Sequence, residues 1–249
     1  LMIWSSDQII FPTHAVPKAG ALPAGSERLQ VETADGQTLH GAYIPASDPD
    51  GSGTLLLGFG GNAWNGEDVA IYLHELYPNA DIATFHYRGY RPSTGSPSAE
   101  ALIADAPVVY DAVVKRLKPK RTVAVGFSIG SGIAATLAGS RKLDGLILVT
   151  PFDSLKEVAQ SLYPWLPVGL FFHHEVDAGE AVPRTKVPTA IIAAEHDEII
   201  PPRRTDALRP MVGNLVFDRA IADAGHNDIY GRDEFQTAMR EALRAVLTN

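Results

Sequence analysis

Three side chains far apart in the sequence, Ser128, Asp197 and His226, carry the groups needed for nucleophilic acyl transfer. A serine hydroxyl is a poor nucleophile at neutral pH, so a histidine must accept its proton and later deliver that proton to the leaving group. A buried carboxylate orients the imidazole and stabilises the imidazolium that forms. The chemistry that these residue types allow is the attack of a serine on an acyl carbonyl.

The candidate nucleophile, Ser128, is the central residue of the pentapeptide GFSIG, residues 126–130. Before it lies a run of β-formers, Thr122–Val125, and after it come small residues compatible with a helix. A strand that ends in a tight turn and leads into a helix is the setting in which G-x-S-x-G marks a nucleophilic serine. Flanking glycines let the strand and helix pass closely, and the helix N-terminus directs its N–H groups towards the serine. An ordinary strand–helix turn is the competing interpretation.

The candidate acid and histidine come from two later loops. Asp197 follows the predicted strand Thr189–Ala194, and His226 follows the predicted strand Leu215–Ile221. Catalytic groups of an open α/β sheet lie on loops at the carboxyl ends of its strands. The chain order serine, acid, histidine is the one expected of a serine hydrolase on such a sheet.

Both assignments have alternatives. Glu195 and Glu198 flank the candidate acid, and any of the three acids can serve only as a salt-bridge partner; we favour Asp197. Among the eight histidines, His226 alone lies in a Gly-flanked loop between the last predicted strand and the last predicted helix. An isolated histidine in such a loop is usually a surface residue, but the preceding pentapeptide favours the catalytic interpretation.

The loop after the first predicted parallel strand, residues 58–64 (GFGGNAW), is rich in glycine. Glycines let backbone N–H groups approach a reacting oxygen, and we expect the N–H groups of Asn62 and Ile129 to form an oxyanion hole. A Gly-rich loop after a strand can instead bind phosphate. Neither a dinucleotide fingerprint nor a phosphate-loop lysine follows, so we favour the oxyanion role.

The composition excludes several classes of function. The chain of 249 residues has a net charge of −8, 45% hydrophobic residues and no long basic run, so nucleic acid is not an expected partner. The absence of cysteine excludes disulfides, a thiolate nucleophile and thiolate metal sites. We expect no metal and no cofactor.

The periodicity of apolar residues predicts an α/β fold. Two β-like runs, Leu29–Ala34 and Thr38–Ile44, are joined by Asp35-Gly36, a strong hairpin signal. Strands and helices then alternate, which predicts a sheet of about eight strands, mostly parallel, with helices on both faces. We expect one domain over residues 1–249. The later strands are predicted at Thr54–Phe59, Ile82–Tyr87, Thr122–Val125, Gly145–Thr150, Thr189–Ala194 and Leu215–Ile221, and the helices at Gly66–Leu76, Ala99–Leu117 (with a kink or offset boundary at Pro107), after Ser128, at Arg203–Met211 and at Arg232–Leu247.

Two segments do not follow this alternation. Residues 1–26 are rich in Pro, Ala and Gly and are predicted to be an extended lead-in, and residues 153–182 form a long insertion between two core strands. The apolar residues of the insertion can pack on the sheet or form a small lid, and we favour a lid. The side chains expected on the apolar side of an acyl pocket, each of which can also be core, are Trp64, Trp165, Phe171 and Phe172.

The N-terminal residues Leu1-Met2-Ile3-Trp4 are apolar, but no stretch approaches the ~20 apolar residues of a membrane span. A short apolar arm packed on the domain is one interpretation. We favour a chain cut just after a signal or anchor helix, because the first residue is not Met. This interpretation predicts membrane association or export, and a cytoplasmic protein is the alternative.

A series of short motifs, in one order from about Ile9 to the C-terminus, resembles the α/β-hydrolase superfamily. More narrowly, it resembles the Bem46-like proteins and the ABHD13- and ABHD17-type enzymes. The motifs are residues 9–12 (IIFP), 60–63 (GGNA), 87–90 (YRGY) with 95–98 (GSPS), 126–130 (GFSIG), 163–167 (YPWLP), 197–201 (DEIIP) and 225–228 (GHND).

The resemblance implies a triad of Ser128, Asp197 and His226, an oxyanion hole that includes Asn62, and hydrolysis of esters or thioesters without a metal. Some relatives remove fatty acyl groups from proteins, so lipid-like acyl compounds and acylated proteins are implied substrates. Many members carry an N-terminal hydrophobic anchor. A scaffold used only for binding, or a peptidase acting on small peptides, is the alternative function.

This chain departs from the family pattern at three places. Gly60 stands where a histidine is usual, Ala193-Ala194 stands where His-Gly often precedes the acid loop, and Ser131 replaces a common glycine. None of these departures removes a member of the implied triad.

Overall fold

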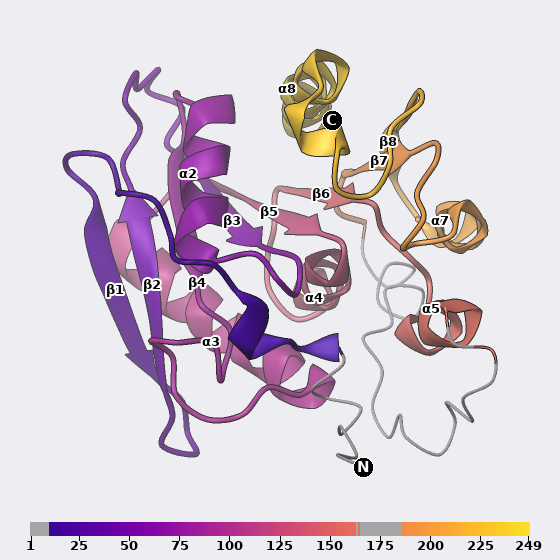
Figure 1. Ribbon diagram of the computed structural model, residues 1–249. Helices are drawn as coiled ribbons and strands as arrows, with labels where there is room; N and C mark the ends of the chain where they lie inside the picture. The colour runs from indigo at the N-terminus through magenta and orange to yellow at the C-terminus, as the bar shows by residue number, and fades with distance from the viewer. Residues whose placement is uncertain (1–9, 163, 165–185) are drawn as a thin grey trace, which may run out of the picture. The chain divides into compact units, whose positions relative to one another are not determined.

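A computed structural model of the chain describes residues 10–162, 164 and 186–249 (Figure 1). The backbone divides into two compact units, residues 1–122 and 123–249. The described residues contain eight strands, β1 to β8, separated by helices after the first two strands. Each unit is built around four of these strands.

The strands of the first unit are β1 (Glu27–Glu32), β2 (Thr38–Ile44), β3 (Thr54–Phe59) and β4 (Asp81–Phe85), in the order β1-β2-β4-β3. Pairing is antiparallel for β1 with β2 and for β2 with β4, and parallel for β3 with β4. The predicted hairpin is confirmed. Strand β1 ends at Glu32, two residues before the predicted end, because the backbone of Thr33 joins the turn: its C=O accepts from the Gly36 N–H at 3.0 Å.

Two helices of the first unit, α2 (Gly66–Leu76) and α3 (Ala99–Leu117), have the predicted bounds and lie in front of and behind its strands in Figure 1. Each begins at a side-chain cap, Asn65 for α2 and Ser98 for α3, which accepts a backbone N–H of the first turn. The buried face of α3 repeats every three or four residues, as the apolar pattern predicted. Of the two alternatives predicted at Pro107, the offset boundary is wrong, because α3 continues across this residue, and the kink stays a prediction.

The strands of the second unit are β5 (Arg121–Phe127, which begins at the unit boundary), β6 (Gly145–Val149), β7 (Thr189–Ala194) and β8 (Leu215–Ile221). They lie in this order and every pairing is parallel. All residues of β6 and β7 are buried, which is typical of parallel strands covered on both faces. Together the eight strands confirm the predicted α/β class, a mostly parallel sheet with antiparallel strands at its N-terminal end.

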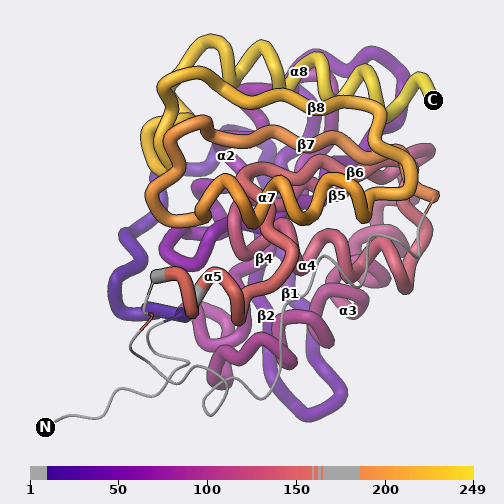
Figure 2. Tube along the Cα trace, turned by 90° about the vertical axis from the view of Figure 1, so that its right-hand side faces the viewer, coloured from indigo at the N-terminus to yellow at the C-terminus, as the bar shows by residue number. Residues whose placement is uncertain are grey.

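The helices of the second unit are α4 (Ile129–Ala138), α5 (Leu155–Leu162), α7 (Pro202–Leu208) and α8 (Asp233–Leu247). In Figures 1 and 2, α7 and α8 lie on opposite sides of β7 and β8. Helix α8 begins one residue after the predicted start. The predicted helix 203–211 is wrong at both ends: α7 starts at Pro202, and residues Arg209–Met211 form a 3₁₀ turn around Pro210, which has no N–H for an α-helical bond.

Two further strand ends differ from prediction. Strand β4 ends at Phe85 rather than at Tyr87, because Tyr87 begins a turn closed by the Tyr90 N–H. Strand β6 ends at Val149, since Thr150 has a positive φ of 46° that interrupts extended backbone.

The predicted lead-in and lid fall partly outside the described residues. From residue 10 the lead-in contains one 3₁₀ turn, Thr13–Ala15, and no strand. Helix α5 lies near the start of the predicted lid, residues 153–182. Residues 163 and 165–182 lie outside the part that the structure describes. None of the described helices combines the length and the hydropathy needed to cross a bilayer. The assignment of residues 1–249 to one domain stays a prediction.

Candidate active site

Ser128 lies at the turn between β5 and α4, with φ 55° and ψ −119°. A positive φ in a residue other than glycine is strained and persists only where the surroundings impose it. Three hydrogen bonds impose it here. The Ser128 N–H donates to the Val149 carbonyl of β6 at 2.9 Å, and the Ser128 carbonyl accepts from the Ser131 N–H at 2.9 Å and from the Ser131 hydroxyl at 2.5 Å. Ser131, which departs from the family pattern, thus stabilises the strained turn through two hydrogen bonds to the Ser128 carbonyl.

Gly126 permits the close approach of β5 to α4. A β-carbon on this residue would lie 2.3 Å from the Gly130 carbonyl oxygen and 2.6 Å from the Ser131 Cα. Both atoms belong to backbone, so neither can move aside without moving the helix. The first glycine of the pentapeptide is therefore required by the packing of the turn.

Gly126→Ala is expected to lower the free energy of unfolding by about 3 kcal/mol, a large value for overpacking because the clash is with backbone. Chemical denaturation of the purified variant measures the change. Gly231→Ala is the matched control, since a β-carbon there meets nothing within 4 Å. Equal stability of the two variants would contradict the close approach of β5 and α4.

His226 and Asp197 form a buried pair in the second unit. The His226 Nδ1 lies 2.9 Å from Asp197 Oδ2 and 3.1 Å from Oδ1. The two residues are only 8% and 9% exposed. The N–H groups of Ile199 and Ile200 also donate to Asp197 Oδ1, at 2.9 and 2.7 Å, and hold the carboxylate in place. A carboxylate facing Nδ1 keeps the proton on that nitrogen and leaves Nε2 able to accept one.

The two neighbouring acids bind backbone rather than the imidazole. Glu198 Oε2 accepts the N–H of His226 at 3.1 Å, and Glu195 Oε2 accepts the N–H of Asp223 at 2.8 Å. The acid loop after β7 therefore contacts the histidine loop after β8 through three acidic residues, Glu195, Asp197 and Glu198, which bind different groups. Asp197 is the one that orients the ring.

The histidine loop is also closed from its other side. Asp228 Oδ1 accepts the Gly225 N–H at 2.6 Å, and Arg232 donates both to Asp228 Oδ2 at 3.1 Å and to the Asp223 carbonyl at 2.8 Å. The Arg232 guanidinium and the Gly225 N–H lower the pKa of Asp228, which keeps this carboxyl ionised at neutral pH. Residues on both sides of His226 are thus held independently of its ring.

The two residues predicted to supply oxyanion donors belong to different units. Asn62 lies in the first unit, where its side-chain amide donates to the Ile10 carbonyl at 2.6 Å. Among the described residues, the backbone N–H of Asn62 has no acceptor. Ile129 is the first residue of α4, so its N–H has no partner within the helix.

Gly60 occupies the position where a histidine is usual in the family pattern. A β-carbon there would lie 2.6 Å from Cγ2 of Val69, a buried residue of α2. A side chain at residue 60 therefore requires a change in the packing of α2 against this loop.

Of the residues predicted for an acyl pocket, only Trp64 lies in the described part of the chain. It is half-buried, and its ring packs edge to face on Tyr72 with a centroid distance of 5.4 Å. Trp165, Phe171 and Phe172 lie outside the described residues.

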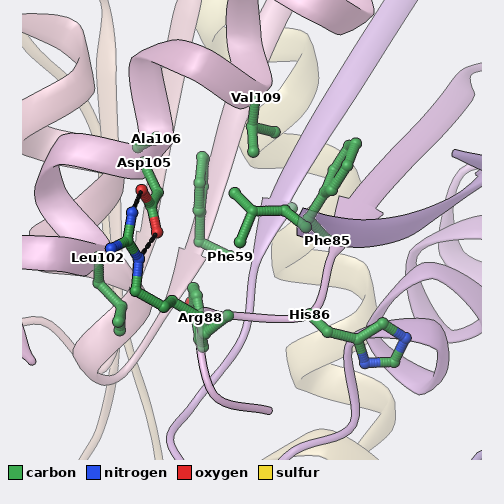
Figure 3. Close-up of a pocket in the computed structure, with 11 residues that line it drawn as sticks. Phe59, Phe85, His86, Arg88, Leu102, Asp105, Ala106 and Val109 are labelled. Atoms are coloured by element: carbon green, nitrogen blue, oxygen red, sulfur yellow. Dashed lines mark hydrogen bonds and ion pairs between the residues drawn. The ribbon is translucent and has the colours of Figure 1, made fainter. Parts of the chain in front are cut away.

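A small cavity in the first unit, about 20 Å³ in volume, has room for about one water molecule (Figure 3). It lies among Phe59, Phe85, Leu102 and Val109, beside the ion pair of Arg88 with Asp105. This volume is too small for a substrate, and none of the candidate catalytic residues lines the cavity.

Arg88, from the YRGY motif, connects three segments of the first unit. Its guanidinium donates to Asp105 of α3 at 2.8 and 3.0 Å and to Asp35 of the β1–β2 turn at 2.5 and 3.0 Å. Hydrogen bonds from Arg88, then from Thr33, lower the pKa of Asp35 to about 2. Two carboxylates neutralise this arginine, so its role is structural.

In the part of the chain that the structure describes, Glu195, His196 and Asp223 form the one cluster of possible metal ligands, with ligand atoms within 4.8 Å of one another. All three residues are exposed. Glu195 already binds the Asp223 backbone and lies 3.8 Å from His196 Nε2. A mechanism without a metal or cofactor stays a prediction.

Comparison with curated proteins identifies relatives that cover between 59% and 100% of this chain. The uncharacterized protein Rv2307c of Mycobacterium tuberculosis is 33% identical over 260 residues, an alignment that covers 100% of this chain and 89% of that protein. The lysophosphatidylserine lipase ABHD12 of Danio rerio is 32% identical over 170 residues, which covers 59% of this chain and 44% of the lipase. Protein bem46 of Schizosaccharomyces pombe is 27% identical over 197 residues and covers 76% and 66% of the two chains.

Solved structures agree on the fold. The Pyrococcus furiosus esterase Pf2001 superposes with a TM-score of 0.74 over 92% of this chain and 96% of the esterase, at 16% identity. The acetyl xylan esterase from Paenibacillus sp. R4 superposes with a TM-score of 0.68 over 90% and 89% of the two chains, at 18% identity. A family model described as the alpha/beta hydrolase fold matches residues 55–180. Because this match covers half of the chain, the chain belongs to the α/β hydrolase family.

Proposed function

We propose that this protein is a serine hydrolase that cleaves carboxylic esters or acyl thioesters through an acyl-enzyme on Ser128. The observation that carries the proposal is the buried pair of His226 and Asp197, with Nδ1 2.9 Å from the carboxylate. A serine held at φ 55° between a strand and a helix supplies the matching nucleophile. Family membership and the esterases among the structural neighbours support the same reaction class.

The reaction follows from these roles. Ser128 Oγ attacks the acyl carbon while His226 Nε2 accepts the hydroxyl proton, and the N–H groups of Ile129 and Asn62 bind the resulting oxyanion. Collapse of the tetrahedral intermediate expels the alcohol or thiol, which takes the proton from His226. Water then attacks the acyl-enzyme with His226 again as base, releasing the acid and restoring Ser128. Asp197 orients the imidazole throughout.

We propose further that the protein belongs with the Bem46-like enzymes and acts on lipid-like acyl substrates, including acylated proteins. The supporting observations are the similarity to protein bem46 and to a lysophosphatidylserine lipase. The residues predicted from the sequence for the apolar side of an acyl pocket are Trp64, Trp165, Phe171 and Phe172, of which only Trp64 lies in the described part of the chain. Attachment to a membrane through an N-terminal segment fits the same substrate class.

Two experiments test these proposals. A fluorophosphonate probe is expected to label the folded protein on one peptide, the one that contains Ser128, as mass spectrometry would show. Folded protein that stays unlabelled would refute the serine hydrolase and favour a scaffold used for binding. A chain-length series of activated esters and thioesters then tests the substrate class: a preference for long chains supports a lipid-like substrate, and a preference for acetyl or butyryl chains refutes it.

A further inference from the structure

Two tyrosines of the YRGY motif, Tyr87 and Tyr90, contact the loop that follows β3. They are the first and last residues of one β-turn, closed by the Tyr90 N–H on the Tyr87 carbonyl at 2.8 Å, with Gly89 at φ 80° in the third position. Their rings pack edge to face, with centroids 5.7 Å apart. The turn therefore presents two phenol groups side by side.

Each hydroxyl group donates to a carbonyl of the same loop. Tyr87 donates to the Gly60 carbonyl and Tyr90 to the Asn62 carbonyl, both at 2.7 Å. The carbonyl between them, that of Gly61, accepts the Trp64 N–H at 3.3 Å. Three consecutive carbonyls of the loop are thus held, two of them by the tyrosines.

These bonds determine the direction of one N–H group. A trans peptide is planar and its C=O and N–H point in opposite directions, so the Gly61 carbonyl and the Asn62 N–H are a single rigid unit. The tyrosines fix the peptide planes on either side of this unit. Gly60 and Gly61 have no β-carbon to restrict their backbone, so the restraint must come from outside the loop.

The tyrosines are suited to a permanent role as donors. Tyr90 is 4% exposed. Burial, together with the repulsion between the two phenols in the case of Tyr87, raises the pKa of both hydroxyl groups above the usual range. Each therefore keeps its proton over the whole pH range in which a histidine base works.

We propose that Tyr87 and Tyr90 are positioning residues that fix the 61–62 peptide group and so direct the Asn62 N–H for oxyanion binding. This inference rests on the proposed function, in which that N–H is one of the two oxyanion donors. It assigns a role to a motif that the triad does not use. The tyrosines touch neither the substrate nor the reacting atoms and act only through the loop.

The test compares Tyr87→Phe, Tyr90→Phe and the double variant in the hydrolysis of a p-nitrophenyl ester. Loss of a whole oxyanion donor costs ~10²–10³ in rate, so a misdirected donor is expected to lower kcat about 10-fold in each single variant and about 100-fold in the double variant. The KM is expected to change less than about 3-fold, because the ground-state ester uses the donor weakly. A boronic acid, which forms a tetrahedral adduct on serine, is expected to bind more weakly by the same factor as the fall in kcat/KM.

Tyr43→Phe is the matched control, since Tyr43 lies on β2 of the same unit, outside the loop, where burial and then the nearby Asp81 carboxylate raise the pKa of its hydroxyl. It is expected to keep the wild-type kcat. A double variant with the wild-type kcat, or a control that loses as much, would overturn the inference. So would a loss carried by KM alone.

Hydrogen exchange separates this inference from the proposed function. The amide of Trp64, which donates to the Gly61 carbonyl, is expected to exchange at least about 10-fold faster in the double variant than in wild type, whatever the protein catalyses. Unchanged exchange would refute the positioning role even in an active enzyme. Absence of fluorophosphonate labelling in wild type would instead refute the proposed function, and exchange would still decide whether the tyrosines hold the loop.

Discussion

Ser128→Ala is expected to lower kcat for an activated ester by about 10⁵–10⁶-fold, to the rate that binding and oxyanion donors alone supply. The hydroxyl is the only group of this residue that forms the acyl-enzyme, and alanine removes it while leaving the β-carbon in place. Steady-state hydrolysis of a p-nitrophenyl ester measures the loss, and the fluorophosphonate label is expected to disappear with it.

A second serine of the same unit provides the control. Ser140 is exposed in the turn after α4, and its hydroxyl donates to the Leu137 carbonyl at 3.3 Å. Ser140→Ala removes the same atom and is expected to keep both the rate and the label. Ester turnover in Ser128→Ala above about 1% of the wild-type rate would contradict the assignment of the nucleophile, since the loss expected from removing it is far larger.

The strained backbone of Ser128 predicts a difference in stability between two variants of this residue. At φ 55° and ψ −119° an alanine keeps the strain, whereas a glycine relieves it, because it has no β-carbon. Ser128→Gly and Ser128→Ala are both expected to be inactive. The free energy of unfolding of the glycine variant is expected to exceed that of the alanine variant by about 1–3 kcal/mol, the strain that glycine relieves. An alanine variant that is as stable as the glycine variant would show that the turn is unstrained.

Local signals in the sequence were enough to predict the elements that carry the candidate site. The pentapeptide at residues 126–130 places a strand before Ser128 and a helix after it, and both are present as β5 and α4. The runs Thr189–Ala194 and Leu215–Ile221 are β7 and β8 with the predicted bounds. The run Thr189–Ala194 is recognisable because parallel strands buried on both faces are almost continuously apolar, whereas β8 is only partly buried and contains Asp218 and Arg219.

The predicted ends of strands and helices were wrong where a residue near the end takes part in a turn or lacks a backbone N–H. The Thr33 side chain and backbone belong to the β1–β2 turn, where the Gln37 N–H donates to Thr33 Oγ1 at 3.0 Å, so β1 could not extend to Ala34. Pro210 interrupts the helix predicted over residues 203–211 for want of an N–H. Helix α3 tolerates Pro107, although a proline inside a helix usually predicts a boundary.

Contacts between distant loops could not be read from the sequence. The three acids among residues 195–198 after β7 are equivalent by pattern, and only the fold distinguishes the one at the His226 ring from those at the backbone. The bonds from Tyr87 and Tyr90 to the β3 loop join residues 27 and 28 positions apart. No periodicity encodes such pairs, because side-chain to backbone bonds depend on where the loops meet.

Asp197→Asn is expected to lower kcat about 10⁴-fold, more than any other single substitution in the acid loop. The Asn oxygen can still accept the Ile199 and Ile200 N–H groups, so the loop stays folded. Its amide nitrogen then faces His226 Nδ1 as a donor, which forces the imidazole proton to Nε2. A ring protonated at Nε2 cannot accept the Ser128 proton.

Glu198→Gln and Glu195→Gln test whether this loss is specific to the imidazole partner. Each glutamine keeps an oxygen that can accept the backbone N–H which the glutamate accepts now, that of His226 or of Asp223. Because these contacts hold the loop and do not set the tautomer, we expect losses below about 10-fold for both variants, in line with the small net value of a single hydrogen bond. Steady-state rates of the three variants, measured at one pH under which all are folded, give the comparison. A fall in kcat of about 10⁴-fold in Glu198→Gln, with little change in Asp197→Asn, would assign the catalytic role to Glu198. It would refute the assignment of Asp197 as the carboxylate that orients His226.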